Sequence, residues 1–192
     1  MKIPVCLPVL LSTALWLTGV HATEHNPPAH SPVKPQGAAT ITPDRDWSAW
    51  QKESASDLKC GEGKVLIGRE HQGDENADSR ILCATVIQFE PLKKFNETLG
   101  ESLPSNNFDF TCPSPKVVTG RSSEGDENGT TQFQCAEFRD AWGDALRPIK
   151  TRTIEGKESS HQLTCDENEV VIGSGHSGDE NGVTTYHCAK LF

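Results

Sequence analysis

The chain has 192 residues, of which 18 are basic and 27 acidic, so its formal net charge is −9. A nucleic-acid-binding protein normally presents a basic face, and an anionic membrane surface repels a chain of this sign. The composition therefore argues against both partners and favours neutral or cationic ones.

The N-terminus has the form of a secretory signal peptide. One basic residue, Lys2, precedes an apolar run that ends in the small-residue pattern Val20-His21-Ala22. The run is too short to span a bilayer with the usual margin, so residues 1–22 are predicted to be cleaved. No membrane insertion is expected after cleavage. Loss of Lys2 leaves 18 − 1 = 17 basic and 27 acidic residues, a net charge of −10.

Residues 23–45 are rich in proline and poor in large apolar side chains, a composition typical of a disordered or extended linker. The remaining stretch, 46–192, is long enough to bury a core and is predicted to be a single β domain. Its three repeats are expected at about residues 47–95, 96–140 and 141–192.

The cysteines predict a disulfide framework. Of the seven present, Cys6 leaves with the signal peptide and six remain. An even number of cysteines in an exported chain implies disulfides in an oxidising compartment, so the mature protein is expected to be secreted or periplasmic. The six form three pairs with one common separation of 23 positions, which predicts the disulfides Cys60–Cys83, Cys112–Cys135 and Cys165–Cys188.

The segments between the paired cysteines are three versions of one sequence. Eight positions after the first cysteine each has a glycine, namely Gly68, Gly120 and Gly173. Thirteen positions after that cysteine, all three segments contain Gly-Asp-Glu-Asn. The first cysteines lie 52 and 53 residues apart, and such a period is typical of a tandem supersecondary unit.

Each segment has the pattern of a β-hairpin, because a Val-rich run and a threonine- and aromatic-containing run flank a polar turn. Asn128-Gly129 and Asn181-Gly182 suit a type I′ turn. The linkers 84–111 and 136–164 are each expected to hold one or two further strands, and Gly143–Ile149 could form one helical turn. We therefore predict an all-β fold of three tandem disulfide-looped hairpin repeats with pseudo-threefold organisation, as a prism or barrel.

The Gly-Asp-Glu-Asn motifs are the candidate binding site. Asp and Asn commonly stabilise turns, and a purely structural role is one interpretation. A second is that the tips bind sugar hydroxyls with threefold avidity, and a third is that they bind Ca²⁺, which needs six to eight oxygens. The candidate ligand-binding residues are Asp74, Glu75, Asn76, Asp126, Glu127, Asn128, Asp179, Glu180 and Asn181.

Four further side chains share offsets between copies. His71 and His176 are expected to be surface histidines beside the acidic loops, with a metal-ligand pair as the alternative. Arg69 and Arg121 are expected to pair with loop carboxylates. Three tryptophans lie outside the shared motif and are expected to be buried, with a sugar-stacking platform as the alternative: Trp47, Trp50 and Trp142.

Nothing in the sequence specifies catalysis. Pairing of all six mature cysteines leaves no thiol nucleophile. Gly173–Gly178 matches the residue pattern of a dinucleotide-binding fingerprint. That fingerprint requires a helix after the strand, whereas a hairpin is expected here. No asymmetric group of titratable residues is apparent that would break the threefold pattern. Asn96 and Asn128 begin glycosylation sequons.

The repeats resemble those of the dermatopontin family. The likeness is carried by the Val-rich strand of Phe110–Arg121 and by the aromatic residue two before the closing cysteine in Gln132–Cys135. The resemblance implies a secreted, disulfide-looped β protein in a group that includes matrix-adhesion proteins and invertebrate lectins, without catalytic activity. The family usually has Asp-Arg-x-Trp in this loop, whereas this chain has Asn128-Gly129-Thr130-Thr131.

Together these observations predict a secreted, non-enzymatic, lectin-like module whose hairpin loops recognise glycans, with no cofactor expected and bound Ca²⁺ as the alternative. The expected partner is a glycan or a protein on a cell surface or matrix. The alternative is a protein-interaction module, such as a periplasmic inhibitor or the receptor-binding part of an exported toxin. A small secreted hydrolase ranks last.

Overall fold

The computed structural model describes residues 37–192 except 74–76, 126–127 and 179–181. Over these residues the protein consists of 15 β-strands and no helix, which confirms the predicted all-β class. Gly143–Ile149 is therefore not a helical turn. The described residues include no helix that is long and apolar enough to cross a membrane.

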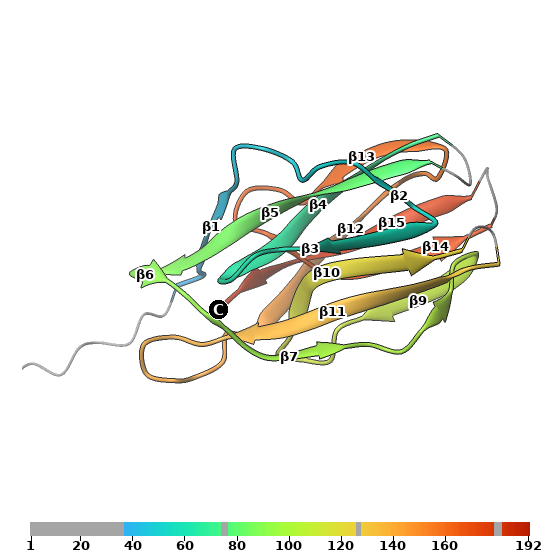
Figure 1. The fold of residues 1–192 in the computed structure, drawn as a ribbon. Coiled ribbons are helices and arrows are strands. Elements are labelled where there is room, and N and C mark those ends of the chain that lie inside the picture. Colours follow the sequence, from blue (N-terminus) through green and yellow to red (C-terminus); the bar gives the residue numbers. More distant parts are fainter. Residues whose placement is uncertain (1–36, 74–76, 126–127, 179–181) are drawn as a thin grey trace, which may run out of the picture. The chain divides into compact units, whose positions relative to one another are not determined.

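The strands form three antiparallel sheets (Figure 1). The first contains β1 (Thr40–Pro43), β5 (Asp78–Gln88), β4 (Lys64–Gln72) and β13 (Ser160–Thr164), with the short β2 (Gln51–Lys52) and β6 (Glu90–Pro91) on β5. The second contains β3 (Ala55–Lys59), β10 (Val117–Glu124), β11 (Thr130–Phe138) and β7 (Lys94–Leu99), with β8 (Leu103–Pro104) on β11. The third contains β12 (Pro148–Lys157), β15 (Val183–Leu191), β14 (Val170–Ser177) and β9 (Asn107–Thr111).

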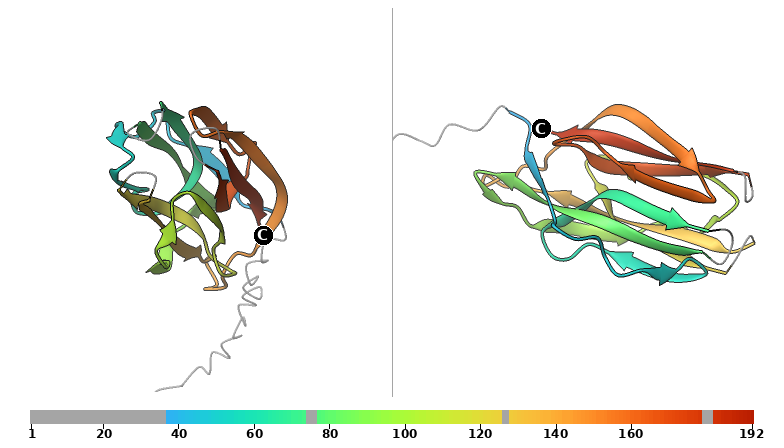
Figure 2. Two further views of the ribbon diagram at one scale, coloured as in Figure 1. Left: turned by 90° about the vertical axis from the view of Figure 1, so that its right-hand side faces the viewer. Right: turned by 90° about the horizontal axis from the view of Figure 1, so that it is seen from above.

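Each sheet is built on one of the predicted hairpins, β4–β5, β10–β11 or β14–β15. All three hairpins contain a bulge at the same offset, immediately before the shared glycine: between Leu66 and Gly68, Val118 and Gly120, and Val171 and Gly173. A bulge increases the local twist of a strand pair. Viewed end-on, the sheets curve around a shared interior (Figure 2).

Each sheet is completed by a strand that comes from a different part of the chain. The strand just before Cys60, β3, pairs with β10 of the second hairpin. The strand before Cys112, β9, pairs with β14 of the third, and the strand before Cys165, β13, returns to β4 of the first. The pairing is therefore cyclic, and its register is the same in all three cases: Lys59 faces Gly120, Thr111 faces Gly173 and Thr164 faces Gly68.

The three predicted disulfides are present, with Cα–Cα distances of 5.7, 5.9 and 5.7 Å. Each one joins two sheets. Cys60 continues β3 by donating its backbone N–H to Thr119 of the second sheet, yet its sulfur bonds Cys83 in the first. The other two disulfides repeat this arrangement between the remaining sheets. Disulfides of this kind indicate an oxidising compartment.

Two apolar clusters fill the interior, and both take residues from all three sheets. One is built around Val65, Val117 and Val170, which are all fully buried. The other surrounds the three disulfides and includes Phe133 and Tyr186. Because neither cluster belongs to a single hairpin, the sheets are expected to fold as one cooperative unit.

The β domain begins before residue 46. The strand β1 falls inside the stretch 23–45 that was expected to be a linker, yet it pairs with β5 along its whole length. Ala39 and Ile41 are buried in the first apolar cluster. Their burial explains the difference, because composition alone does not show that two apolar residues of a proline-rich stretch cover a core.

The shared glycine of each hairpin is required by strand exchange. A Cβ atom on Gly173 would lie 2.2 Å from the carbonyl oxygen of Phe110 in the exchanged strand β9. We expect Gly173→Ala to lower the free energy of unfolding by about 3 kcal/mol, the upper end of overpacking costs, because a backbone atom cannot rotate away. Urea unfolding measures the change.

Gly61→Ala is the matched control, because a Cβ there would meet nothing within 4 Å. Its effect should stay within about 0.5 kcal/mol. Equal stability of the two variants would show that β9 does not approach Gly173 closely.

Candidate functional site

The three hairpins end at the same end of the molecule, called here the tip end and defined by Gly73, Gly125 and Gly178 (Figures 1 and 2). These glycines have φ angles of 105°, 84° and 103°, a left-handed region that strongly favours glycine. Of the candidate ligand-binding residues, Asn128 is exposed in a turn beside Gly129. The others lie outside the described residues: Asp74, Glu75, Asn76, Asp126, Glu127, Asp179, Glu180 and Asn181.

Three two-residue turns connect the bases of neighbouring hairpins at the tip end. The turn at Glu53-Ser54 donates the N–H of Glu53 to Ala77 of the first hairpin and accepts the N–H of Gly125 of the second, at 2.8 and 2.9 Å. The turns at 105–106 and 158–159 make the corresponding pairs of bonds. The result is a closed ring of six backbone hydrogen bonds, called here the tip ring. It fixes the spacing of the hairpin bases.

Charged and imidazole side chains fill the interior beside the tip ring. We call them the histidine–carboxylate cluster, and they are Glu53, Arg69, His71, Arg121, Glu158, His161 and His176. Both carboxylates of the cluster come from turns of the tip ring, and its arginines and histidines come from strands of all three sheets. Buried charges are stable only when they are paired and hydrogen-bonded, and the contacts below pair both carboxylates. Two buried nitrogens of the cluster, Arg69 Nε and His71 Nε2, have no hydrogen-bond partner among the described residues.

Glu53 is the shared counter-ion of two buried guanidinium groups. Its Oε2 lies 2.6 Å from Arg69 Nη2, its Oε1 accepts from Arg121 Nη1, and Ser123 Oγ donates to Oε1 at 3.2 Å. Burial alone would raise the pKa of Glu53, but the charges of Arg121 and Arg69 outweigh it and hold the pKa well below its usual value. Glu53 is thus an anion that joins the first and second sheets.

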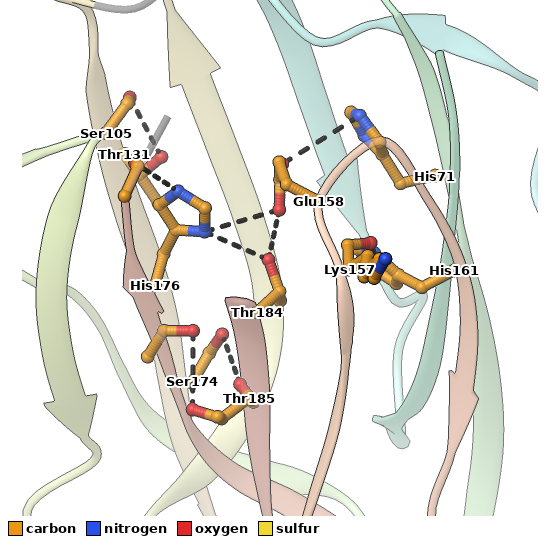
Figure 3. Close-up of polar contacts among 12 residues, drawn as sticks. His71, Ser105, Thr131, Lys157, Glu158, His161, Ser174, His176, Thr184 and Thr185 are labelled. Atoms are coloured by element: carbon orange, nitrogen blue, oxygen red, sulfur yellow. Dashed lines mark hydrogen bonds and ion pairs between the residues drawn. The ribbon is translucent and has the colours of Figure 1, made fainter. Parts of the chain in front are cut away.

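Glu158 lies between two histidines (Figure 3). Its Oε2 is 3.3 Å from His176 Nδ1 and accepts a hydrogen bond from Thr184, while Oε1 is 3.8 Å from His71 Nε2. Burial raises the pKa of this carboxyl, yet the hydrogen bond from His176 and the charge of Arg69 bring it below its usual value. His176 Nε2 also donates to the carbonyl of Gly178, which ties the cluster to the tip end.

His161 is held as a neutral ring. Its Nδ1 donates to the carbonyl of Lys157 at 2.9 Å, so its Nε2 is left to accept from Arg69 Nη1 at 3.4 Å. Burial and the adjacent guanidinium lower the pKa of His161 to about 4. The ring also stacks on His71 at a centroid distance of 5.6 Å.

The prediction that His71 and His176 lie on the surface was wrong, because both are buried. Arg69 and Arg121 pair with Glu53, a carboxylate of a tip-ring turn that the prediction did not name. The carboxylates of the Gly-Asp-Glu-Asn loops lie outside the described residues. The cluster is also asymmetric, because Ser105 stands where the other two turns have glutamate. One signal was present: Lys52-Glu53-Ser54 and Lys157-Glu158-Ser159 occupy equal offsets before Cys60 and Cys165. Of the residues in this shared stretch, only the glutamates belong to the cluster, because Lys52 and Lys157 lie outside it.

The tryptophans are not simply buried. Arg80 lies over the rings of Trp47 and Trp50, at 5.4 and 4.4 Å from their centroids, and its guanidinium forms an ion pair with Glu70 at 2.6 Å. The side chains of Trp50 and Trp142 are partly exposed. Because a cation occupies a face of both rings, this pair is a cation–π clamp on the first sheet rather than an open sugar platform.

The described residues provide no ready metal centre. Apart from Cys165, Glu169 and Cys188, no three potential ligand atoms among them lie within 4.8 Å of one another. The two cysteines are bonded to each other and cannot bind a metal as thiolates. His71 and His176 thus contact Glu158 without forming a preorganised three-ligand site. The cluster therefore consists of paired charges that hold the turns of the tip ring in place.

Glu53→Gln tests whether Glu53 holds the tip end together. Its loss should lower the free energy of unfolding by about 3 kcal/mol, because two buried guanidinium groups lose their counter-ion. Asp57→Asn is the control, since Asp57 pairs with Lys59 on the surface, and it should change stability by less than about 0.5 kcal/mol. Similar values for both variants in chemical unfolding would rule out a structural role for Glu53.

His161 should make stability depend on pH. Its pKa is about 4 when folded against 6.5 as a free side chain, so between these values the unfolded chain binds more protons. Stability is then full above the higher value and should fall by roughly 3 kcal/mol as pH is lowered from about 7 to about 4. Glu53 and Glu158 add their own loss as the pH falls below about 5, because the pKa of each is lower in the folded protein than the 4.5 of a free glutamate.

The measurement is urea unfolding across this pH range for the wild type and His161→Gln. Glutamine keeps an acceptor for Arg69 but does not titrate, so the variant should show a flatter dependence. Identical slopes would contradict the neutral assignment.

No protein-family model matches this chain, and neither a curated protein nor a solved structure matches it. The resemblance to the dermatopontin family therefore stays a hypothesis from the sequence. Function has to be inferred from the tip end and the surfaces beside it.

Proposed function

We propose that the mature protein is a secreted or periplasmic, non-enzymatic binding module that recognises glycans through its three Gly-Asp-Glu-Asn motifs. The observation that supports this most is the tip ring, because it fixes three hairpin bases at one end of the molecule. A scaffold that holds several weak sites at a fixed spacing gains avidity without any new contact.

The chemistry of the motif suits a polyhydroxylated ligand. Carboxylate, amide and backbone groups can all hydrogen-bond sugar hydroxyls. Turn geometry explains Asp and Asn but does not require a glutamate, and all three copies have one. Ca²⁺ is a possible partner in such a site, but one motif has too few oxygens for the six to eight ligands that this ion takes.

We also propose that the three tips belong to three tandem repeats with pseudo-threefold organisation. Three observations support it: the common disulfide separation of 23 residues, the bulge at one offset and the identical register of the exchanged strands. In a lectin of this design, each repeat would contribute one tip to a common binding end.

A glycan array of the mature protein, with and without Ca²⁺, tests the function. We expect binding to at least one glycan class, weakened about tenfold or more when Glu75, Glu127 and Glu180 are all changed to glutamine, because charged hydrogen bonds are lost at every tip.

The matched control changes three exposed glutamates outside the motifs, Glu62, Glu101 and Glu167, and thus removes the same charge. The control should bind as the wild type does. Absence of binding to any glycan in either condition would refute the proposal, and a stoichiometric protein partner from the native compartment would favour a protein-interaction role.

A further inference from the structure

A groove of about 540 Å³ lies on the third sheet, on the face turned away from the apolar core. All four strands contribute to it, and the residues that matter here are Asn107, Asp109, Thr153, Gly175, Thr185 and His187. Its volume is within the range of small-ligand sites. These six residues lie outside the Gly-Asp-Glu-Asn motifs and the histidine–carboxylate cluster, whereas His176 of that cluster also lines the groove.

The groove exists because Gly175 has no side chain. Gly175 pairs with Thr185 on one side and with Asp109 on the other. In the first sheet the corresponding register position is Glu70, which pairs with Arg80 and Gln162.

There the ion pair of Glu70 with Arg80, together with the tryptophans stacked on Arg80, covers the face. In the second sheet the position is Ser122. Of the three corresponding positions, only the one in the third sheet, Gly175, has no side chain.

His187 holds the polar wall of the groove in place. Its Nδ1 accepts from Lys150 Nζ at 3.3 Å and lies 3.1 Å from Thr153 Oγ1, so its proton is on Nε2. That nitrogen donates to Asp109 Oδ1 at 3.0 Å. The carboxylate of Asp109 is oriented by this bond although it is 81% exposed, so its remaining lone pairs face solvent.

We propose that this groove is a carbohydrate subsite that takes one neutral sugar residue with vicinal hydroxyls. Asp109 would accept from two adjacent hydroxyls. The hydroxyl of Thr185, which donates its proton to the carbonyl of Gly175, can accept from a ligand, and the amide of Asn107 can both donate and accept. The exposed apolar side chain of Val183 would contact the C–H face of the ring. The carboxylate of Asp109 repels anionic ligands, which favours a neutral sugar.

This inference rests on the proposed function and gives it a location. Ser177 and Val183 line the groove; Ser177 directly precedes the third motif, and Val183 follows it after Gly182, so a glycan bound there would continue towards the third tip. The groove would recognise one terminal residue of the glycan, and the tips would contact the remainder.

The test is an NMR titration of the ¹⁵N-labelled mature protein with methyl α-mannoside, methyl β-galactoside and methyl β-N-acetylglucosaminide. We expect at least one glycoside to shift the amide signals of Gly175, Thr185 and His187 in a saturable manner. Gly175→Glu should abolish these shifts by filling the groove. Ser122→Glu adds the same side chain at the corresponding position of the second sheet and should leave them intact.

Two milder variants keep the test decisive if Gly175→Glu does not fold, because a Cβ at residue 175 would lie 2.8 Å from Thr185 Oγ1. Asp109→Asn still accepts from His187, and Thr185→Val preserves shape, so both should fold and weaken binding about tenfold. Unchanged affinity in all folded variants would overturn the groove as the subsite.

The outcomes separate the two proposals. Glycan binding on the array together with shifts confined to residues at the tip end would overturn the groove and leave the proposed function standing. No shift with any of the three glycosides, together with an array that shows no binding, would refute both.

Discussion

Exchange of strands between neighbouring sheets is the constraint on which the rest of the structure depends. Each of β3, β9 and β13 forms a ladder with the next hairpin around the ring, while the cysteine that follows it is bonded to the hairpin of its own segment. Every sheet is therefore joined to both neighbours by hydrogen bonds and by a disulfide bond. The disulfides restrict the conformations of the unfolded chain, and the strand ladders close the ring of three sheets in the folded chain.

The same exchange creates the tip end. The residues before each exchanged strand form a turn that must pass between two hairpin bases, and their backbone groups close the tip ring. Glu53 and Glu158 stand in these turns and point into the interior, where they meet arginines and histidines from the strands. A polar interior at this end replaces the apolar packing found around the disulfides. Its hydrogen bonds fix one arrangement of the turns, as buried polar groups require specific partners.

Much of this fold could be predicted from the sequence, but the exchange could not. Equal cysteine spacing identified the disulfides, and Asn-Gly turns between β-branched runs identified the hairpins. A period of 52 or 53 residues is the same whether β3 pairs with its own hairpin or the next one. His71 was expected at the surface because its neighbours in sequence are polar. Its burial follows only from the packing of β13 beside β4. Gly175 is one of several glycines in its strand, and its importance appears only when Glu70 is seen at the same register.

Interstrand nuclear Overhauser effects in the labelled mature protein test strand exchange most directly. Cyclic exchange predicts contacts of Lys59 with Gly120, of Thr111 with Gly173 and of Thr164 with Gly68. If each of these strands paired with its own hairpin, Lys59 would instead lie beside Gly68. That result would contradict the closed ring, and with it the positions assigned to the tip ring, the buried cluster and the groove.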